Sequence, residues 1–281
     1  MNSGLKILFV FVDGLGMGSG DPAINPLADR ERFPNLGKIL AQAVPLDAAL
    51  GVPGLPQSAT GQAALLTGLN APDLMGRHIE GFPPPRLKEL VQENNIFSRL
   101  LAAGKTCTFA NAYWLDDIAQ IPARRASVTT VATLAAFGRV RGKDDLLASR
   151  AVYHDLTREK LRERGYEGPL ITPEEAAAHL IGIAEKHDFT LFEFFQTDHA
   201  GHGGVPEKIF QILDKLDRFL GGLFAFDGVL VVSSDHGNIE DSTVRSHTMN
   251  PVPLFSSRPD VFQGLENIAQ FTPVVLRALG V

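Results

Sequence analysis

Three apolar runs in this 281-residue sequence lead into acidic side chains, and this arrangement constrains the fold more than any other feature. The runs are ILFVFV, FTLFEFFQT and VLVVSS, and they precede Asp13, Asp198 and Asp235. Near-continuous apolar runs are typical of strands that are buried on both faces of a parallel sheet. The carboxyl ends of such strands lie along one edge of an open α/β sheet, so we expect the three carboxylates to converge there.

Imidazole side chains and a hydroxyl accompany these carboxylates. The motifs FFQTDHAGH, DHG and RSHTMNP supply His202, His236 and His247, and LPQSATGQAALLTG supplies Ser58. Oxygen and imidazole ligands in this number suit two divalent metal ions. Each motif alone is more often a turn, a helix cap or a solvated histidine, so the prediction of a metal centre depends on all of them converging.

A glycine-rich turn, DGLGMGSG, follows the first run. Such turns can cradle a pyrophosphate, but glycines at positions 14, 16, 18 and 20 do not match the G-x-G-x-x-G spacing. A carboxylate at the strand end, Asp13, would also repel a pyrophosphate unless a cation lay between them. We therefore reject a nicotinamide-nucleotide site and retain the metal.

Ser58 is the candidate nucleophile. Residues 59–66 are good helix formers, which places the Ser58 hydroxyl near a helix amino terminus, where backbone N–H groups and the helix dipole favour an anion. A purely structural role as an N-cap is compatible with this one. Residue chemistry alone leaves Thr60 as a competitor.

These motifs resemble the alkaline phosphatase superfamily of metalloenzymes, and within it the branch of cofactor-independent phosphoglycerate mutase and phosphopentomutase. The resemblance covers residues 5–68 and 189–256. It implies an α/β three-layer sandwich with a mostly parallel central sheet. It also implies two metal sites, one held by Asp13, Ser58, Asp235 and His236 and the other by Asp198, His202 and His247.

The resemblance also favours Ser58 over Thr60. Sulfatases of the superfamily carry their nucleophile ten residues before the glycine of a leucine-leucine-threonine-glycine run, and that count from Gly68 gives Ser58. The mutase branch has a glycine three residues after the nucleophile, which is Gly61 here. A sulfatase is disfavoured, because Gln62 stands where the sulfatase motif has an arginine.

Composition indicates an ordinary globular protein, with 44% hydrophobic and 21% charged residues, and one domain over residues 1–281 is the simplest organisation. A formal net charge of −6 gives no support to nucleic acid as a partner, whereas bound metal would attract a small anionic phosphorylated substrate locally. The single cysteine, Cys107, suits a reducing compartment, so we expect a cytoplasmic protein. The first apolar run is too short for a membrane span.

The middle of the chain decides between hydrolysis and isomerisation. We expect a strand over 106–112 and helices over 87–103, 127–137, 173–187, 206–221 and 266–279. Residues 138–172, with a short helix over 156–164, then remain as a small lid. The mutases of the branch insert a whole second domain that closes over the phosphoenzyme and excludes water. A cap of that size does not fit here, so we expect an open cleft.

Other polar and aromatic side chains near the motifs are weaker candidates. Arginine offers a bidentate fork for phosphate, although a surface role is more common; the residues concerned are Arg77, His78, Glu80, Arg86 and Arg245. Phe82, Tyr113 and Trp114 could stack on a ring, but such residues usually serve packing. His199 is a neighbour of the centre rather than a ligand.

The sequence therefore predicts a two-metal phosphoryl-transfer enzyme that hydrolyses a small phosphate mono- or diester through a phosphoserine at Ser58. Manganese and zinc both suit the mixed carboxylate and imidazole ligands. One alternative is a phosphomutase of the same branch. Another is a metal-binding module without turnover, which the presence of a nucleophile beside six ligands disfavours. No oligomeric state is predicted.

Overall fold

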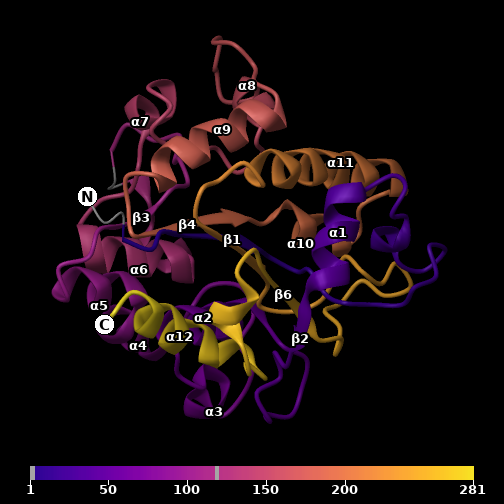
Figure 1. The fold of residues 1–281 in the computed structure, drawn as a ribbon, viewed down its shortest axis with the longest axis horizontal. Coiled ribbons are helices and arrows are strands. Elements are labelled where there is room, and N and C mark those ends of the chain that lie inside the picture. The colour runs from indigo at the N-terminus through magenta and orange to yellow at the C-terminus, as the bar shows by residue number, and fades with distance from the viewer. Residues whose placement is uncertain (1–3, 118–119) are drawn as a thin grey trace.

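A computed structural model of the chain describes residues 4–117 and 120–281. Its centre is one six-stranded sheet with the order β2-β6-β5-β1-β4-β3 (Figure 1). Strands β3, β4, β1 and β5 run parallel, whereas β6 is antiparallel to β5 and β2 is antiparallel to β6. The predicted fold class is confirmed. The strands are β1 Ile7–Val12, β2 Val44–Leu46, β3 Cys107–Phe109, β4 Phe189–Phe194, β5 Val229–Ser233 and β6 Val252–Ser256.

The central strand β1 sets the position of the site. All six of its residues are buried, as its unbroken apolar sequence predicts. In the register of the sheet, Val12 pairs with Phe194 of β4, and Phe11 pairs with Ser233 of β5. The three strands therefore end level with one another, so that the segments after them start at the same edge.

Helices cover both faces of the sheet, so the fold has three layers with the sheet in the middle. Phe9 of β1 belongs to a buried cluster with residues of α2, α4, α5, α6 and α12, and Val10 belongs to a second cluster with residues of α1, α9 and α11. In Figure 1 the layer with α9 and α11 lies above the sheet and the layer with α2, α4 and α12 lies below it. The helices are α1 Pro34–Gln42, α2 Ser58–Thr67, α3 Ala71–Met75, α4 Pro85–Asn94, α5 Ile96–Ala102, α6 Val128–Phe137, α7 Lys143–Leu147, α8 Glu159–Arg162, α9 Pro173–Ala184, α10 Gln196–Gly201, α11 Pro206–Leu223 and α12 Phe271–Ala278.

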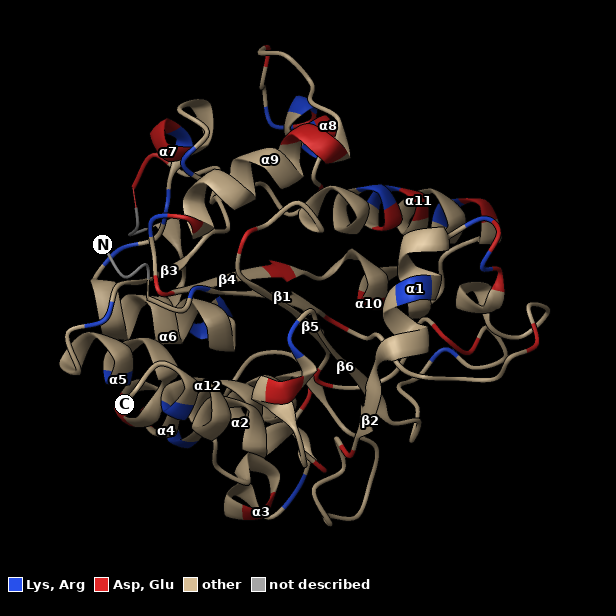
Figure 2. Cartoon of the chain, viewed as in Figure 1, with Lys and Arg blue, Asp and Glu red and all other residues tan. Residues whose placement is uncertain are grey.

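The longest helix, α11, shows why the outer layer is stable in water. It buries Leu213, Leu216 and Leu220 against the sheet. Basic and acidic residues alternate along the rest of the helix (Figure 2), so its exposed face carries both signs of charge. Within the described ranges, every helix falls short of the length and apolarity that a membrane crossing requires.

Two of the predicted helices, 127–137 and 173–187, begin within one residue of their predicted starts, and a capping side chain precedes each. Thr172 accepts a hydrogen bond from the backbone N–H of Glu175 at 3.2 Å, and the Glu175 carboxylate accepts one from the Thr172 N–H at 2.7 Å, which is a complete capping box for α9. Ser127 caps α6 through the N–H of Thr130 at 3.2 Å. Local sequence therefore determines these two starts.

The prediction of one helix over 87–103 is wrong, because the helix is interrupted at Asn95. This residue has an extended backbone, with ψ of 151°, and it separates α4 from α5. Its amide oxygen accepts the N–H of Ser98 at 2.9 Å and its amide nitrogen donates to the carbonyl of Val91 at 3.0 Å. Asparagine side chains compete with the helical backbone in this way, so Asn95 ends one helix and caps the next.

Three other predicted elements differ in extent. Strand β3 covers less of the predicted 106–112, although Asn111 and Ala112 continue as isolated bridges. The carboxyl-terminal helix predicted over 266–279 begins with a 3-10 turn, Ile268–Gln270, before α12. The second apolar run stops being a strand at Phe194 and continues as α10, so Asp198 lies inside a short helix rather than directly after the strand.

Residues 138–172 contain one helix more than predicted, since α7 precedes the expected α8. Leu146, Tyr153, Leu161 and Tyr166 of this segment form a small buried cluster together with Ala112. Figure 1 shows α7 and α8 at the outer edge of the molecule, beside α9. The single domain and the lid remain predictions.

Candidate metal centre

The structure brings all seven predicted ligand and nucleophile side chains together at the carboxyl edge of the sheet. Asp13 follows β1, Asp235 and His236 follow β5, and Asp198 lies in α10 after β4. The others are Ser58 at the start of α2, His202 at the end of α10 and His247 before β6. Their roles in metal binding and catalysis remain predictions.

Four donor atoms surround one point near β1. The Nε2 atom of His236 lies 2.9 Å from Ser58 Oγ, 3.2 Å from Asp13 Oδ1 and 3.6 Å from Asp235 Oδ2. One imidazole nitrogen carries at most one proton, so it cannot donate hydrogen bonds to three oxygens. Four ligand atoms about 2.1 Å from an ion at tetrahedral angles would lie about 3.4 Å apart. The observed spacing therefore fits the ligand set of a divalent ion.

Each of the two carboxylates in this group has one oxygen whose burial is not compensated. Oδ1 of Asp13 and Oδ2 of Asp235 have no hydrogen-bond partner among the described residues. Burial, and then the nearby Asp235, raise the pKa of Asp13 to about 7. Burial likewise raises the pKa of Asp235 well above its usual value. Buried carboxylates without partners are costly, and a bound cation is the usual remedy.

A second set of three donors has the same spacing. Asp198 Oδ1 lies 3.3 Å from His202 Nε2 and 3.4 Å from His247 Nε2, and the two nitrogens are 3.1 Å apart. The other nitrogen of each ring is held by a backbone carbonyl, since His202 Nδ1 contacts Arg245 O at 2.9 Å and His247 Nδ1 contacts Pro56 O at 2.8 Å. These bonds place the proton on Nδ1 and leave Nε2 free to bind a metal.

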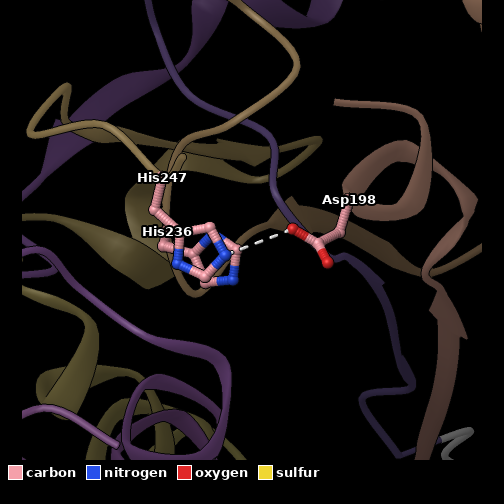
Figure 3. A group of neighbouring side chains, drawn as sticks. All are labelled: Asp198, His236 and His247. Atoms are coloured by element: carbon pink, nitrogen blue, oxygen red, sulfur yellow. Dashed lines mark ion pairs between the residues drawn. The ribbon is translucent and has the colours of Figure 1, made fainter. Parts of the chain in front are cut away.

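His236 lies between the two sets. Its ligand atom is within 4.8 Å of those of Asp13 and Asp235, and it is equally within 4.8 Å of those of Asp198 and His247. Figure 3 shows the imidazoles of His236 and His247 overlapping, with Asp198 directed toward them. The pKa of Asp198 is lowered, because His247 and its other polar neighbours outweigh the opposing effect of burial. The two sets thus form one continuous centre.

Glycine at position 61 allows α2 to reach this centre. A Cβ at Gly61 would lie 2.8 Å from the carbonyl oxygen of Asp235 and 2.9 Å from its Cβ, closer than real Cβ atoms approach. Only glycine lets the helix pack so tightly against the turn after β5. This contact holds Ser58, three residues earlier, against His236.

The expected anion cradle at the start of α2 is wrong in part. The N–H groups of Ala59 and Thr60 donate to the carbonyl of Ile79, at 3.1 and 3.4 Å, rather than toward the centre. Gln57 is the N-cap, so Ser58 is the first helical residue and is not a cap. Thr60 is buried and its hydroxyl bonds to Gln57 O and Ile79 N. The competing nucleophile therefore points away from the metal centre.

Glu240 is a central residue that the sequence motifs did not reveal. Its Oε2 accepts the N–H of Gly16 at 3.0 Å and that of Asn238 at 2.7 Å. Its Oε1 accepts the Thr248 hydroxyl and, at 3.1 Å, the Asn250 amide. A Cβ at Gly16 would lie 2.2 Å from that Oε1, which explains a glycine of DGLGMGSG. This fully buried carboxylate ties together the loops that carry Asp13, His236 and His247.

A second buried carboxylate, Glu193, was hidden inside an apolar run. It lies on β4, accepts the Thr129 hydroxyl at 2.7 Å and shares a cavity with Asp13 and Ser58. Burial raises its pKa to about 8. The only sequence signal for Glu193 was a single acidic residue within FTLFEFF. That signal does not show whether the side chain lies on an exposed strand edge or in a buried site.

The weaker candidates separate into two groups. Arg245 and Glu80 line an opening onto Ser58, Asp198 and His247. Arg77, His78 and Arg86 line neither that opening nor the second cavity beside Ser58, which also reaches Asp13. His78 instead contacts the carbonyl of Val52 at 3.1 Å. His199 is exposed and packs edge-on against Phe195.

Comparison with known proteins agrees with this geometry. A family model described as the metalloenzyme superfamily matches residues 167–273, which include five of the seven positions. Over 119 residues the chain is 31% identical to the 2,3-bisphosphoglycerate-independent phosphoglycerate mutase of Wolinella succinogenes. That match covers 38% of this chain and 24% of the mutase, so the chain aligns with about a quarter of the relative.

Solved structures extend the similarity to the whole fold. A phosphoglycerate mutase of Leishmania mexicana superposes with a TM-score of 0.59 and 12% identity, covering 98% of this chain and 95% of that one. An alkaline phosphatase of the Antarctic bacterium TAB5 gives a TM-score of 0.52 and 14% identity, with 98% of each chain covered. The chain therefore has an alkaline phosphatase-like α/β fold. The resemblance to the metalloenzyme superfamily is confirmed, with partial homology to the cofactor-independent mutases.

Proposed function

We propose that this chain is a two-metal phosphoryl-transfer enzyme that hydrolyses a small phosphate mono- or diester, with Ser58 as its nucleophile. The contact of Ser58 Oγ with His236 Nε2, at 2.9 Å, carries the proposal, because it puts a hydroxyl among the metal ligands. A module that only binds metal needs the ligands but not this hydroxyl. The mouth of a large cavity beside Ser58 supplies room for a substrate.

The proposed ligand sets follow the distances. Ser58, Asp13, Asp235 and His236 would hold one ion, and Asp198, His202 and His247 would hold the other. When bound, the ions would lower the pKa of the hydroxyl and offset negative charge on the phosphoryl oxygens. Mixed carboxylate and imidazole donors suit manganese and zinc.

The chain itself positions the reacting groups. The Ser58 hydroxyl releases its proton to solvent and its Oγ forms a bond to phosphorus, while the bond from phosphorus to the ester oxygen breaks and that oxygen takes up a proton from solvent. The product is a phosphoserine. Water then attacks the same phosphorus, releases inorganic phosphate and restores the serine hydroxyl. Gly61 fixes the height of Ser58 above the turn after β5, and Glu240 holds the three loops of ligands at a constant separation.

A Ser58→Ala variant tests the proposal directly. We expect it to release p-nitrophenol from its phosphate mono- and diesters at a rate lower by on the order of 1,000-fold or more, in manganese and in zinc. Ser98→Ala, the same change on α5 away from the centre, should match the parent. Undiminished turnover in Ser58→Ala would exclude Ser58 as the nucleophile.

Isomerisation is the second candidate, because the sequence relatives include phosphoglycerate mutases. A mutase must protect its phosphoserine from water, which requires an enclosed site. Within residues 138–172, Tyr153, His154 and Arg164 line the cavity. A segment of this length is too short to cover the site completely. We expect 3-phosphoglycerate and ribose 1-phosphate to yield inorganic phosphate if they react. Formation of 2-phosphoglycerate or ribose 5-phosphate without phosphate release would favour the mutase.

A further inference from the structure

A cavity of about 540 Å³ begins at Ser58 and Asp13 and extends as far as Trp114 and Arg164. Cavities of about 300–1,000 Å³ are typical for organic ligands of considerable size. A phosphoryl group with a three-carbon fragment would fill only part of this space. The cavity therefore has room for a larger alcohol on the ester.

The walls of this cavity are rich in aromatic rings. Phe82, Tyr113, Trp114, Tyr153 and Phe195 come from four separate segments and all line it. Phe82 is 52% exposed, so its ring is not committed to the protein core. Flat rings of this kind stack favourably on other planar rings.

Among the described residues that line the cavity, no cationic side chain is buried beside these rings. His154 stacks on Phe195 with ring centroids 4.4 Å apart, and burial, followed by the nearby Lys160, lowers its pKa to about 3. His154 is therefore neutral at pH 7. Arg125 and Arg164 are the only lysine or arginine side chains that line the cavity among the described residues, and both are exposed.

We infer that this cavity binds the alcohol part of the ester, and that this part carries a planar uncharged ring, as in aryl or nucleoside phosphates. The inference rests on the proposed function, which supplies the phosphoryl end of the substrate. It assigns the aromatic wall to recognition of the leaving alcohol.

Direct binding is measurable because Trp114 is the single tryptophan of the chain. The zinc-loaded protein is titrated with benzylphosphonate and with methylphosphonate, which carry the same head group and cannot be hydrolysed. We expect benzylphosphonate to change the tryptophan fluorescence and to compete with inorganic phosphate. It should bind at least about tenfold more tightly than methylphosphonate. Equal affinities for the two phosphonates would overturn the inference.

Phe82 provides the matching kinetic test, because an exposed side chain can be removed without harm to the fold. Benzyl and methyl phosphate release alcohols of similar acidity, so their ratio of kcat/KM reports recognition of the ring. Phe82→Ala and Phe82→Leu should each lower that ratio about two- to tenfold, since leucine keeps bulk but not planarity. Leu74→Ala, an exposed residue on α3, should leave the ratio unchanged. An unchanged ratio in both Phe82 variants would contradict the inference.

Two further comparisons separate the sources of the ring and the causes of failure. Uridine 5′-monophosphate against ribose 5-phosphate tests a nucleoside, as benzyl against methyl phosphate tests an aryl group, and a preference in either pair supports the ring. Tight binding of benzylphosphonate without hydrolysis of any ester would leave the binding site standing and reject the proposed function. Hydrolysis with no preference in either pair would support the proposed function and reject the ring-binding site.

Discussion

The imidazole rings of His236 and His247 stack at a centroid distance of 3.6 Å, with 14° between their planes. Each ring belongs to a different set of donor atoms, so the stack joins the two sets. Movement of one ring must disturb the other, because both are buried. Loss of one ligand should therefore affect both proposed metal sites, though unequally.

His247→Ala should bind one equivalent of metal much more weakly, by at least about tenfold, and the second equivalent slightly more weakly. The fold should persist, since His247 lies at the rim of the sheet. Metal titration calorimetry on the demetallated protein measures both affinities. Met249→Ala, an exposed change two residues further along the same loop, is the control. Two equivalents bound as tightly as in the parent would show that His247 is not a ligand.

Glu240→Gln should destabilise the protein and weaken metal binding together. The amide keeps the size of the side chain, but its NH₂ group faces donors that now lack an acceptor, and each such loss costs about 1–3 kcal/mol. We expect a lower melting temperature without metal and weaker binding of both ions. Asp241→Asn is the neighbouring control. Weaker metal binding at an unchanged melting temperature would indicate that Glu240 acts on the ions alone.

Gly61→Ala should reduce turnover while barely changing the melting temperature. The added Cβ would press on Asp235 and displace Ser58, whereas alanine favours the helix by up to about 1 kcal/mol. We expect a fall in kcat of at least about tenfold. The control is Gly182→Ala on α9, where a Cβ meets nothing within 4 Å. That variant should be more stable and fully active, and full activity in both would refute the positioning role.

The metal-free protein should lose stability as the pH rises from about 7 to 8, where histidines of the unfolded chain are already largely neutral. Burial raises the pKa of Asp13 to about 7 and of Glu193 to about 8, above the value of about 4 in the unfolded chain. The folded state therefore binds more protons than the unfolded state, and the free energy of unfolding falls with pH by up to about 1.4 kcal/mol per unit and carboxyl.

Urea unfolding in the presence of a chelator, at several pH values, measures this slope. Glu193→Gln should reduce it, because the amide does not ionise and can still accept the Thr129 hydroxyl. A saturating divalent metal should flatten it further. A metal-free stability that increases between pH 7 and 8 would contradict the prediction.

The sequence predicted the four parallel strands, their shared edge and the seven side chains that meet there, whereas β2 and β6 were not predicted. A buried parallel strand is visible in the sequence as an unbroken apolar run. The first polar residues after such a run must lie at the carboxyl edge of the sheet. Asp13 and Asp235 follow this rule closely. Asp198 follows it only approximately, since α10 begins two residues after β4.

Features that depend on distant contacts were not predictable. Asn95 interrupts a stretch that is otherwise favourable to a helix, and its own hydrogen bonds decide the outcome. Glu240 gains its importance from Gly16, which is 224 residues away in the chain. The N–H groups of Ala59 and Thr60 are occupied by Ile79, whose position no local pattern reveals.

The proposed metal donors come from five segments that extend from Asp13 to His247. The set of Asp13, Ser58, Asp235 and His236 draws on both ends of the chain, so tight binding of its ion reports that the sheet has been assembled from both of its halves. Ions that bind only the assembled state add about 2.7 kcal/mol of stability each at a concentration 100 times their dissociation constant. The supply of divalent metal would then govern how long the protein survives as well as whether it reacts.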